Sequence, residues 1–172
     1  IEKCTTMPRA AWCILAAGLV SLAFVLITQF SFGYEPCILC LWQRVPYGVA
    51  SVVAIAALLM KPYGRRSLIP LGLATLSFTI GAVLAIFHTG VELHWWLGTS
   101  GCSIRPLNGT AVEDLRTQLL HTVAAHCDEI SWTFLGLSMA NWNVLASLGL
   151  ATFCALAVRR AIDLFHNPNL DG

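Results

Sequence analysis

The chain has 172 residues, the usual length of about one domain, but its composition is not that of a soluble protein. Hydrophobic residues make up 57% and charged residues only 11%, against about 45–50% and about 25% in ordinary globular domains. This composition excludes a disordered chain and argues against a small soluble domain. A net charge of +1 without a basic patch excludes a nucleic-acid-binding protein. The composition therefore indicates an integral membrane protein.

Four apolar stretches are long enough, or nearly long enough, to cross a bilayer as helices, which takes roughly 20 residues each. They cover residues 10–32, 38–60, 68–88 and 143–158. We therefore expect an all-α integral membrane protein, a four-transmembrane-helix bundle that forms a single membrane domain over residues 1–172. Residues 89–142 are too polar to span and are expected to form a long external loop. The first stretch is expected to be retained, because its apolar run is longer than that of a signal peptide and no A-x-A site follows.

The basic residues predict how the helices cross the membrane, because cytoplasmic segments carry an excess of Lys and Arg. Seven of the ten basic residues lie at one side of the expected bundle, namely Lys3, Arg9, Lys61, Arg65, Arg66, Arg159 and Arg160. Both termini and the 61–66 turn are therefore expected to be cytoplasmic. The 33–36 turn and the 89–142 loop are then expected to lie outside.

The most informative motif is Cys37-Ile-Leu-Cys40, a C-x-x-C that opens the second stretch directly after Pro36. Thiols three residues apart at a helix start lie on one face, where exposed amides and the helix dipole stabilise a thiolate. Arg44 follows Cys40 by four residues and lies about one helical turn deeper on the same face. Such a buried charge is either functional or reaches back to the headgroups with its long side chain. The neighbouring C-x-x-C favours a function.

Two further cysteines, Cys102 and Cys127, fall in the external loop, where disulfides persist. With the C-x-x-C they make four outer cysteines, which allow three pairings. Between them, residues 110–123 carry a capping box and apolar positions at helical spacing, which predicts a short amphipathic helix on the outer surface. The loop pair is either redox-active or an ordinary structural disulfide.

Metal binding is the simplest alternative use of these cysteines. A zinc site of four cysteines is disfavoured because the loop cysteines are not closely spaced and the C-x-x-C lies in a hydrophobic helix, so we expect no metal. His121, His126 and Cys127 could supply other zinc ligands, but the two histidines also suit the C-terminal end of a helix. His88 closes the third stretch at the level where the second begins, as either an interfacial histidine or a neighbour of the C-x-x-C. The cysteines without an expected role are Cys4, Cys13 and Cys154.

The chain resembles the bacterial disulfide bond formation protein B (DsbB) family over nearly its whole length. The resemblance rests on the four spans, on Glu35-Pro-Cys-Ile-Leu-Cys-Leu-Trp-Gln-Arg44, on the two loop cysteines, and on the segment from Trp132 to Trp142. It implies a protein-disulfide oxidoreductase of the bacterial inner membrane whose electron acceptor is a quinone, ubiquinone or menaquinone. It further implies that the enzyme keeps a periplasmic DsbA-like dithiol oxidase oxidised. Because DsbA is itself a strong oxidant, only a still stronger acceptor such as a quinone can reoxidise it.

The resemblance also implies the roles of the site residues. A partner thiolate attacks a Cys102–Cys127 disulfide at Cys102, and the released Cys127 then attacks the C-x-x-C disulfide. The reduced C-x-x-C passes two electrons to the quinone, with Cys40 as the thiolate that faces the ring. Arg44 and His88 are expected to contact the quinone. Arg44 would act through its charge, whereas the match of His88 to the family rests on its position alone.

Three rival interpretations remain. A vitamin K epoxide reductase-like protein also joins a C-x-x-C to a quinone, but there the loop cysteines precede the C-x-x-C, and here they follow it. A carrier that brings electrons from the cytoplasm would need a redox pair on that side, where no C-x-x-C occurs. A non-enzymatic membrane protein with structural disulfides leaves Arg44 unexplained.

Overall fold

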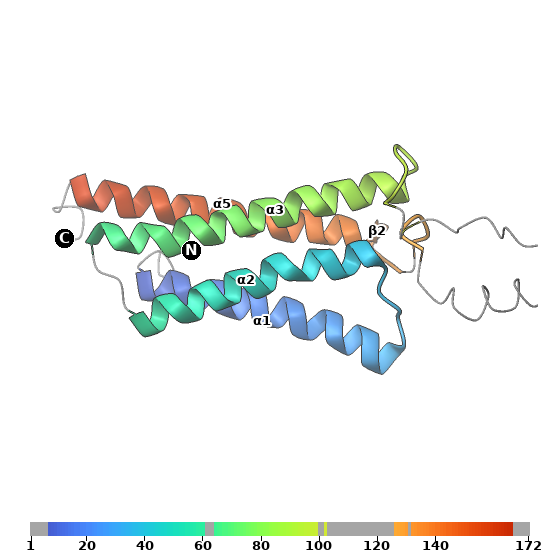
Figure 1. The fold of residues 1–172 in the computed structure, drawn as a ribbon, viewed down its shortest axis with the longest axis horizontal. Coiled ribbons are helices and arrows are strands. Elements are labelled where there is room, and N and C mark those ends of the chain that lie inside the picture. Colours follow the sequence, from blue (N-terminus) through green and yellow to red (C-terminus); the bar gives the residue numbers. More distant parts are fainter. Residues whose placement is uncertain (1–6, 61–63, 100–101, 103–125, 131, 167–172) are drawn as a thin grey trace, which may run out of the picture.

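The computed structural model describes residues 7–60, 64–99, 102, 126–130 and 132–166. Its long helices are α1 (Met7–Phe32), α2 (Ile38–Met60), α3 (Leu68–Glu92) and α5 (Met139–His166), which run alongside one another (Figure 1). All four of these helices in the described part of the chain are long and apolar enough to cross a membrane. Large apolar side chains on their outer faces stay exposed, as lipid-facing residues do, including Phe30, Leu59, Val83 and Leu145. The expected fold class, an all-α membrane bundle, is confirmed.

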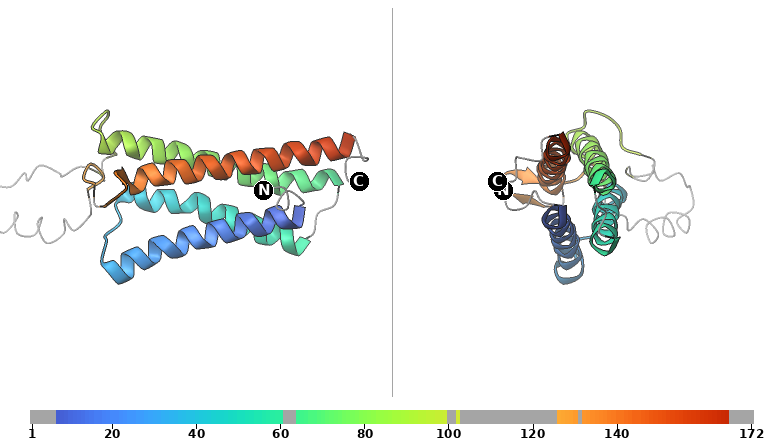
Figure 2. Two further views of the ribbon diagram at one scale, coloured as in Figure 1. Left: turned by 180° about the vertical axis from the view of Figure 1, so that it is seen from behind. Right: turned by 90° about the vertical axis from the view of Figure 1, so that its left-hand side faces the viewer.

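The helices form a ring that is loosely closed on one side. Helix α1 packs on α2, α2 on α3, and α3 on α5, whereas α1 and α5 touch each other far less; Figure 2 shows this arrangement along the bundle. Small residues allow close helix packing in a membrane. At Gly18 of α1 a Cβ atom would collide with the Ser51 Oγ of α2 and lie 3.2 Å from the Tyr47 backbone oxygen, so glycine favours this close crossing. The buried alanines of the core include Ala10, Ala50, Ala54, Ala74 and Ala157.

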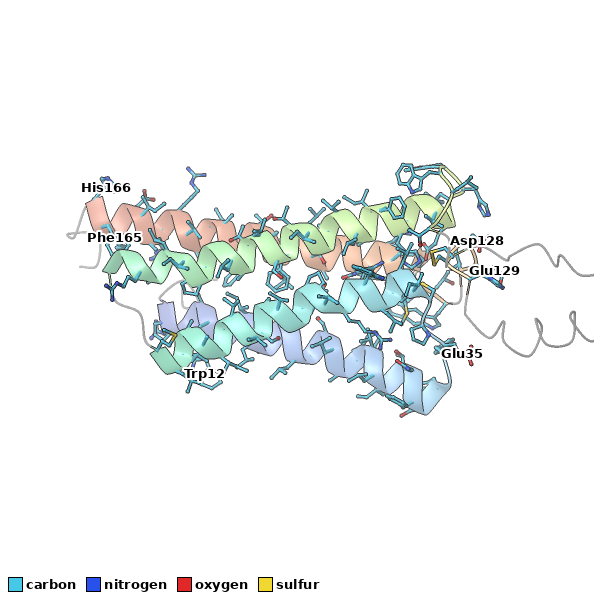
Figure 3. The ribbon with its side chains drawn as sticks, viewed as in Figure 1. Trp12, Glu35, Asp128, Glu129, Phe165 and His166 are labelled. Atoms are coloured by element: carbon cyan, nitrogen blue, oxygen red, sulfur yellow. A yellow bond between two sulfur atoms is a disulfide. The ribbon has the colours of Figure 1, made fainter. Side chains whose placement is uncertain are left out.

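The two ends of the bundle differ. At one end the 3-10 helix η2 (Gly64–Ser67) precedes α3 near the end of α5, while the C-x-x-C and the start of α5 lie at the other (Figure 1). There the antiparallel strands β1 (Thr133–Phe134) and β2 (Leu137–Ser138) form a hairpin. Its two turn residues, Leu135 and Gly136, both have positive φ, 52° and 79°, as a tight type I′ hairpin turn requires. Figure 3 places Glu35, Asp128 and Glu129 at this end, and Trp12, Phe165 and His166 at the opposite one.

Three helices extend further than the apolar stretches that predicted them, and the first of them, α1, begins at Met7 instead of residue 10. Helix α3 continues past residue 88 to Glu92, and α5 begins four residues before the expected 143 and ends eight residues after 158. The physical reason is that apolarity marks the part of a helix inside the hydrocarbon, whereas backbone hydrogen bonds carry the helix on through polar residues such as Arg159. The segment between the third and fourth helices is correspondingly shorter than 89–142. The amphipathic helix predicted over 110–123 lies outside the described residues.

Candidate active site

Cys37 directly precedes α2, and its sulfur caps the start of that helix. The Leu41 N–H donates to the Cys37 carbonyl oxygen at 3.1 Å. The Cys40 N–H donates to the Cys37 Sγ at 3.2 Å, in the place where a serine or aspartate oxygen usually caps a helix. The two sulfurs are free thiols 2.9 Å apart. The side-chain hydrogen bond with Cys40 lowers the pKa of the Cys37 thiol to about 4, and His88 acts in the same direction against the cost of burial.

His88 lies one turn before the end of α3 and faces this sulfur. Its Nε2 is 3.6 Å from the Cys37 Sγ, and its Nδ1 is 2.7 Å from the Nε2 of Gln43 on α2. The ring is only 4% exposed, so it is not the headgroup-solvated histidine that a position at a helix end also allowed. The carboxyl group of Glu92 lies 4.0 Å from the His88 Nε2. It accepts a hydrogen bond from the Ser138 hydroxyl.

Arg44 is held between α1 and α2. Its Nη1 donates to the Gln29 Oε1 of α1 at 2.8 Å, and its side chain is half-buried. This bond ties the guanidinium to α1, and Arg44 and Cys40 both line the cavity described below. Because a guanidinium has five N–H donors, the bond to Gln29 leaves others for a ligand.

The second cysteine pair lies against the first. Cys102 and Cys127 form a disulfide with their Cα atoms 4.9 Å apart. The Cys127 N–H donates to the Cys102 carbonyl at 3.3 Å, and both residues are buried in one cluster with Cys37 and Val91. Nothing in the spacing of the loop cysteines indicated this burial. The cluster brings the two pairs together at one end of the bundle, although 62 residues separate Cys40 from Cys102 in the sequence.

A cavity of about 500 Å³ opens beside the C-x-x-C. Its volume falls in the range of small-molecule sites. Apolar side chains of α1, α5 and the hairpin make up most of its wall, including Val20, Leu22, Phe24, Val25, Phe134 and Met139. Polar side chains also line it, among them Cys37, Cys40, Gln43, Arg44, His88 and Glu92. The cavity therefore suits a ligand that is mostly apolar and carries polar groups.

The same geometry argues against a metal ion. The donor atoms of Cys37, Cys40 and His88 lie within 4.8 Å of one another. However, sulfurs 2.9 Å apart are too close to be two ligands of a tetrahedral zinc, whose Zn–S bonds of about 2.3 Å place them about 3.8 Å apart. Cys102 and Cys127 have no thiolate to offer while they form a disulfide. We assign no metal ligand here.

The structure thus brings all six residues singled out from the sequence to one end of the bundle and adds others. Sequence analysis missed Gln43, Asn143 and Glu92, which line the cavity together with Cys37, Cys40, Arg44 and His88. Glu92 had a detectable signal, since it is an acidic residue that ends an apolar helix four residues after His88. Gln43 and Asn143 had none, because polar amides at helix ends are common.

Comparisons with known proteins give one consistent result. Residues 8–157 match the family model described as "Disulfide bond formation protein DsbB". The "Disulfide bond formation protein B" of Hahella chejuensis (strain KCTC 2396) is 33% identical over 159 residues, covering 86% of this chain and 91% of its own. That of Methylococcus capsulatus (strain ATCC 33009 / NCIMB 11132 / Bath) is 34% identical over 159 residues, covering 88% and 95%. That of Azoarcus sp. (strain BH72) is 32% identical over 136 residues, covering 78% and 81%.

Proposed function

Because this chain belongs to the disulfide bond formation protein DsbB family, we propose that it is a quinone-dependent thiol oxidase that reoxidises a periplasmic DsbA-like dithiol oxidase. Family membership makes it a multi-pass bacterial membrane protein of disulfide bond formation. One observation carries the finer proposal: the Cys102–Cys127 disulfide packs against Cys37, and Cys37 and Cys40 line an apolar cavity. Electrons can therefore pass from a soluble partner to a lipid-soluble acceptor at one end of the bundle.

The first exchange takes place at the loop pair. A thiolate of the partner attacks Cys102, so that the Cys102–Cys127 bond breaks and a mixed disulfide with the partner forms. Both sulfurs are buried, at 1% and 0% exposure, so the partner must displace the covering chain before its thiolate can reach Cys102. This requirement protects the disulfide from small thiols and reserves the reaction for a partner that binds here.

The second exchange moves the electrons to the C-x-x-C. In the oxidised enzyme the released Cys127 attacks the Cys37–Cys40 disulfide at Cys37, the sulfur against which it packs. This attack leaves Cys40 as the thiolate, on the wall of the cavity. The second thiol of the partner then releases the oxidised partner from Cys102. Finally Cys102 attacks the Cys127–Cys37 bond, which restores the loop disulfide and leaves both C-x-x-C thiols reduced.

A quinone, ubiquinone or menaquinone, would be held in this cavity, whose lining combines apolar side chains with polar ones. When bound, the quinone accepts two electrons and two protons as the Cys37–Cys40 disulfide forms again. The guanidinium of Arg44, held by Gln29, lies where it can donate to a quinone oxygen and stabilise a Cys40 thiolate. His88 keeps its Nε2 at the Cys37 sulfur, and the apolar wall excludes water from the exchange.

The orientation is part of the proposal. The two cysteine pairs lie at one end of the bundle, and η2 and the C-terminal end of α5 lie at the other (Figure 1). Arg66 belongs to η2, and Arg159 and Arg160 belong to the C-terminal part of α5. If the basic end faces the cytoplasm, as the excess of Lys and Arg predicts, the cysteine pairs face the oxidising periplasm.

Anaerobic mixing of the purified protein with ubiquinone and a reduced DsbA-like partner tests the function. We expect one quinol for each partner disulfide formed, and none with Cys40→Ser. A Cys154→Ser protein is the matched control, because Cys154 is buried in the core of α5 and does not line the cavity. It should keep the wild-type yield. Partner oxidation without quinol, or quinol formation by Cys40→Ser, would contradict the proposal.

A further inference from the structure

A chain of buried and half-buried side-chain hydrogen bonds leads from α5 through α2 to His88. The Tyr47 hydroxyl donates to the Asn143 Oδ1 at 2.6 Å, and the Ser147 hydroxyl donates to the same oxygen at 3.2 Å. The Asn143 Nδ2 donates to the Gln43 Oε1. The Gln43 Nε2 then contacts the His88 Nδ1 at 2.7 Å.

The direction of donation is the same along the whole chain. A side-chain amide has a donor nitrogen at one side and an acceptor oxygen at the other, so fixing one side fixes the other. Two hydroxyls occupy the Asn143 oxygen, and its nitrogen therefore faces Gln43. The Gln43 oxygen is thereby used, and its nitrogen donates to the His88 Nδ1. A ring nitrogen that accepts a hydrogen bond carries no proton, so the neutral ring carries its proton on Nε2, toward Cys37.

We propose that the Tyr47–Asn143–Gln43 relay holds His88 as the neutral tautomer protonated at Nε2 and so makes it a fixed hydrogen-bond donor to the Cys37 sulfur. Asn143 and Gln43 are then positioning residues that act through His88. The proposal deepens the proposed function, since it rests on Cys37 being a redox sulfur.

The relay also opposes a second proton on His88. An imidazolium would turn a Nδ1–H toward the N–H of Gln43, and two donors facing each other in a buried site lose a hydrogen bond. The ionisable groups that face the ring among the described residues are Cys37 and Cys40 from the start of α2 and Glu92 from its own helix. Glu92 is 4.0 Å from Nε2, beyond hydrogen-bond distance, and accepts from Ser138. His88 therefore stabilises a thiolate at Cys37 as a donor and does not take the proton of that thiol as a base.

Nitrogen NMR of the reduced protein with 15N-labelled histidine reads this state directly, because protonated and bare ring nitrogens have well-separated shifts. The chain has five histidines, so a His88→Gln protein identifies the His88 signals by their loss. For the wild type we expect a bare Nδ1 and a protonated Nε2. A protonated Nδ1 in the wild type, as the opposite tautomer or as imidazolium, would overturn the proposal.

Two variants test the relay itself. Gln43→Glu offers only acceptor oxygens to both neighbours when ionised, so a proton should appear on the His88 Nδ1. Asn143→Leu leaves Gln43 without its anchor, so both tautomers should be present and the pKa of the Cys37 thiol should rise. Asn141→Leu makes the same change two residues earlier on α5, at a side chain that bonds Thr89 and is not in the relay, and should keep the wild-type shifts. Unchanged His88 shifts in both Gln43→Glu and Asn143→Leu would show that the relay does not set the tautomer.

These measurements separate the relay from the proposed function. The spectra are recorded on reduced protein without a quinone or a partner. A wild type that shows the expected shifts but forms no quinol would contradict only the proposed function. A wild type that forms quinol with a protonated Nδ1 would contradict only the relay.

Discussion

Replacing Arg44 by methionine tests the placement of the quinone most directly. Arg44 Nη1 is 2.8 Å from the Gln29 Oε1, and the rest of the guanidinium lies on the cavity wall with Cys40. Methionine keeps much of the apolar length and removes the charge and all five donors. Losing one donor to an oxygen that gains charge in a reaction typically costs about 2.7–4 kcal/mol, or about 10²–10³ in rate. We therefore expect Arg44→Met to lower kcat/KM for quinone by at least about 10².

Two further variants separate the charge of Arg44 from its position. Arg44→Lys keeps a charge but loses the planar fork of the guanidinium, so its loss should fall between those of the wild type and methionine. Gln29→Leu keeps Arg44 intact and removes its anchor on α1. A hydrogen bond to a charged group contributes about 1.5–3 kcal/mol. The freed guanidinium can still reach the quinone, so we expect the loss to lie at the lower limit of this free-energy range. Gln29→Leu should therefore lower kcat/KM for quinone by about tenfold.

The assay follows quinol formation at varied quinone with saturating reduced partner. A second measurement, exchange between the partner and the loop disulfide without quinone, should hardly change in any of the three variants, since that chemistry occurs at Cys102. It also shows that the proteins are folded. Wild-type quinone kinetics in a folded Arg44→Met protein would refute the reasoning and leave Arg44 as a side chain that only anchors α2 to α1.

Three other predictions follow from the same structure. Cys102→Ala should abolish the mixed disulfide with the partner, while quinone reduction by a small dithiol through the C-x-x-C pair persists; equal loss of both would argue against a serial relay. Arg66 is exposed, so in a protein otherwise lacking reactive cysteines the thiol of Arg66→Cys should react with an impermeant reagent only after the membrane is opened. Labelling of this thiol in intact cells would contradict the predicted orientation. Because the pKa of Cys37 is lowered to about 4, the thiolate should be present at neutral pH and disappear only as the pH falls through about 4. The ultraviolet absorbance of the reduced protein should follow that course, and loss of thiolate absorbance already near pH 8, as in a free cysteine, would contradict it.

The fold could be predicted from the sequence to the extent that it depends on local apolarity. The second stretch, 38–60, has the bounds of α2, because Pro36 and Lys61 limit its apolar run on both sides. The fourth stretch, 143–158, is shorter than α5, since Asn141 and Arg159 are polar residues that lie inside the helix. The hairpin before α5 was not predicted, because a Leu135-Gly136 turn lacks the Asn-Gly or Asp-Gly signal of its type.

The candidate site divides in the same way. Cys37, Cys40 and Arg44 could be singled out because they are near one another in sequence and their spacing has a direct meaning on a helix. The contacts of His88 could not, since Gln43 is 45 residues away and Asn143 is 100 residues from Gln43. Such contacts depend on how the helices pack. From the sequence alone, many polar residues at helix ends are equally plausible partners of His88.

The structure makes the two sulfurs of the C-x-x-C unequal, and this inequality follows from where the helix begins. Cys37 precedes the first turn of α2, so it receives the Cys40 N–H and faces His88 and the loop disulfide. Cys40 lies within the first turn and has no such capping bond. A pair that accepts electrons from one partner and delivers them to another benefits from two unlike ends, because a stabilised thiolate is both the better leaving group and the weaker nucleophile. In the proposed sequence, Cys37 carries no charge in its disulfide with Cys40 or in the mixed disulfide with Cys127. Because its surroundings favour a thiolate, they favour the last exchange, in which Cys102 attacks Cys127 and Cys37 leaves as a thiolate, and this drives the electrons toward the cavity.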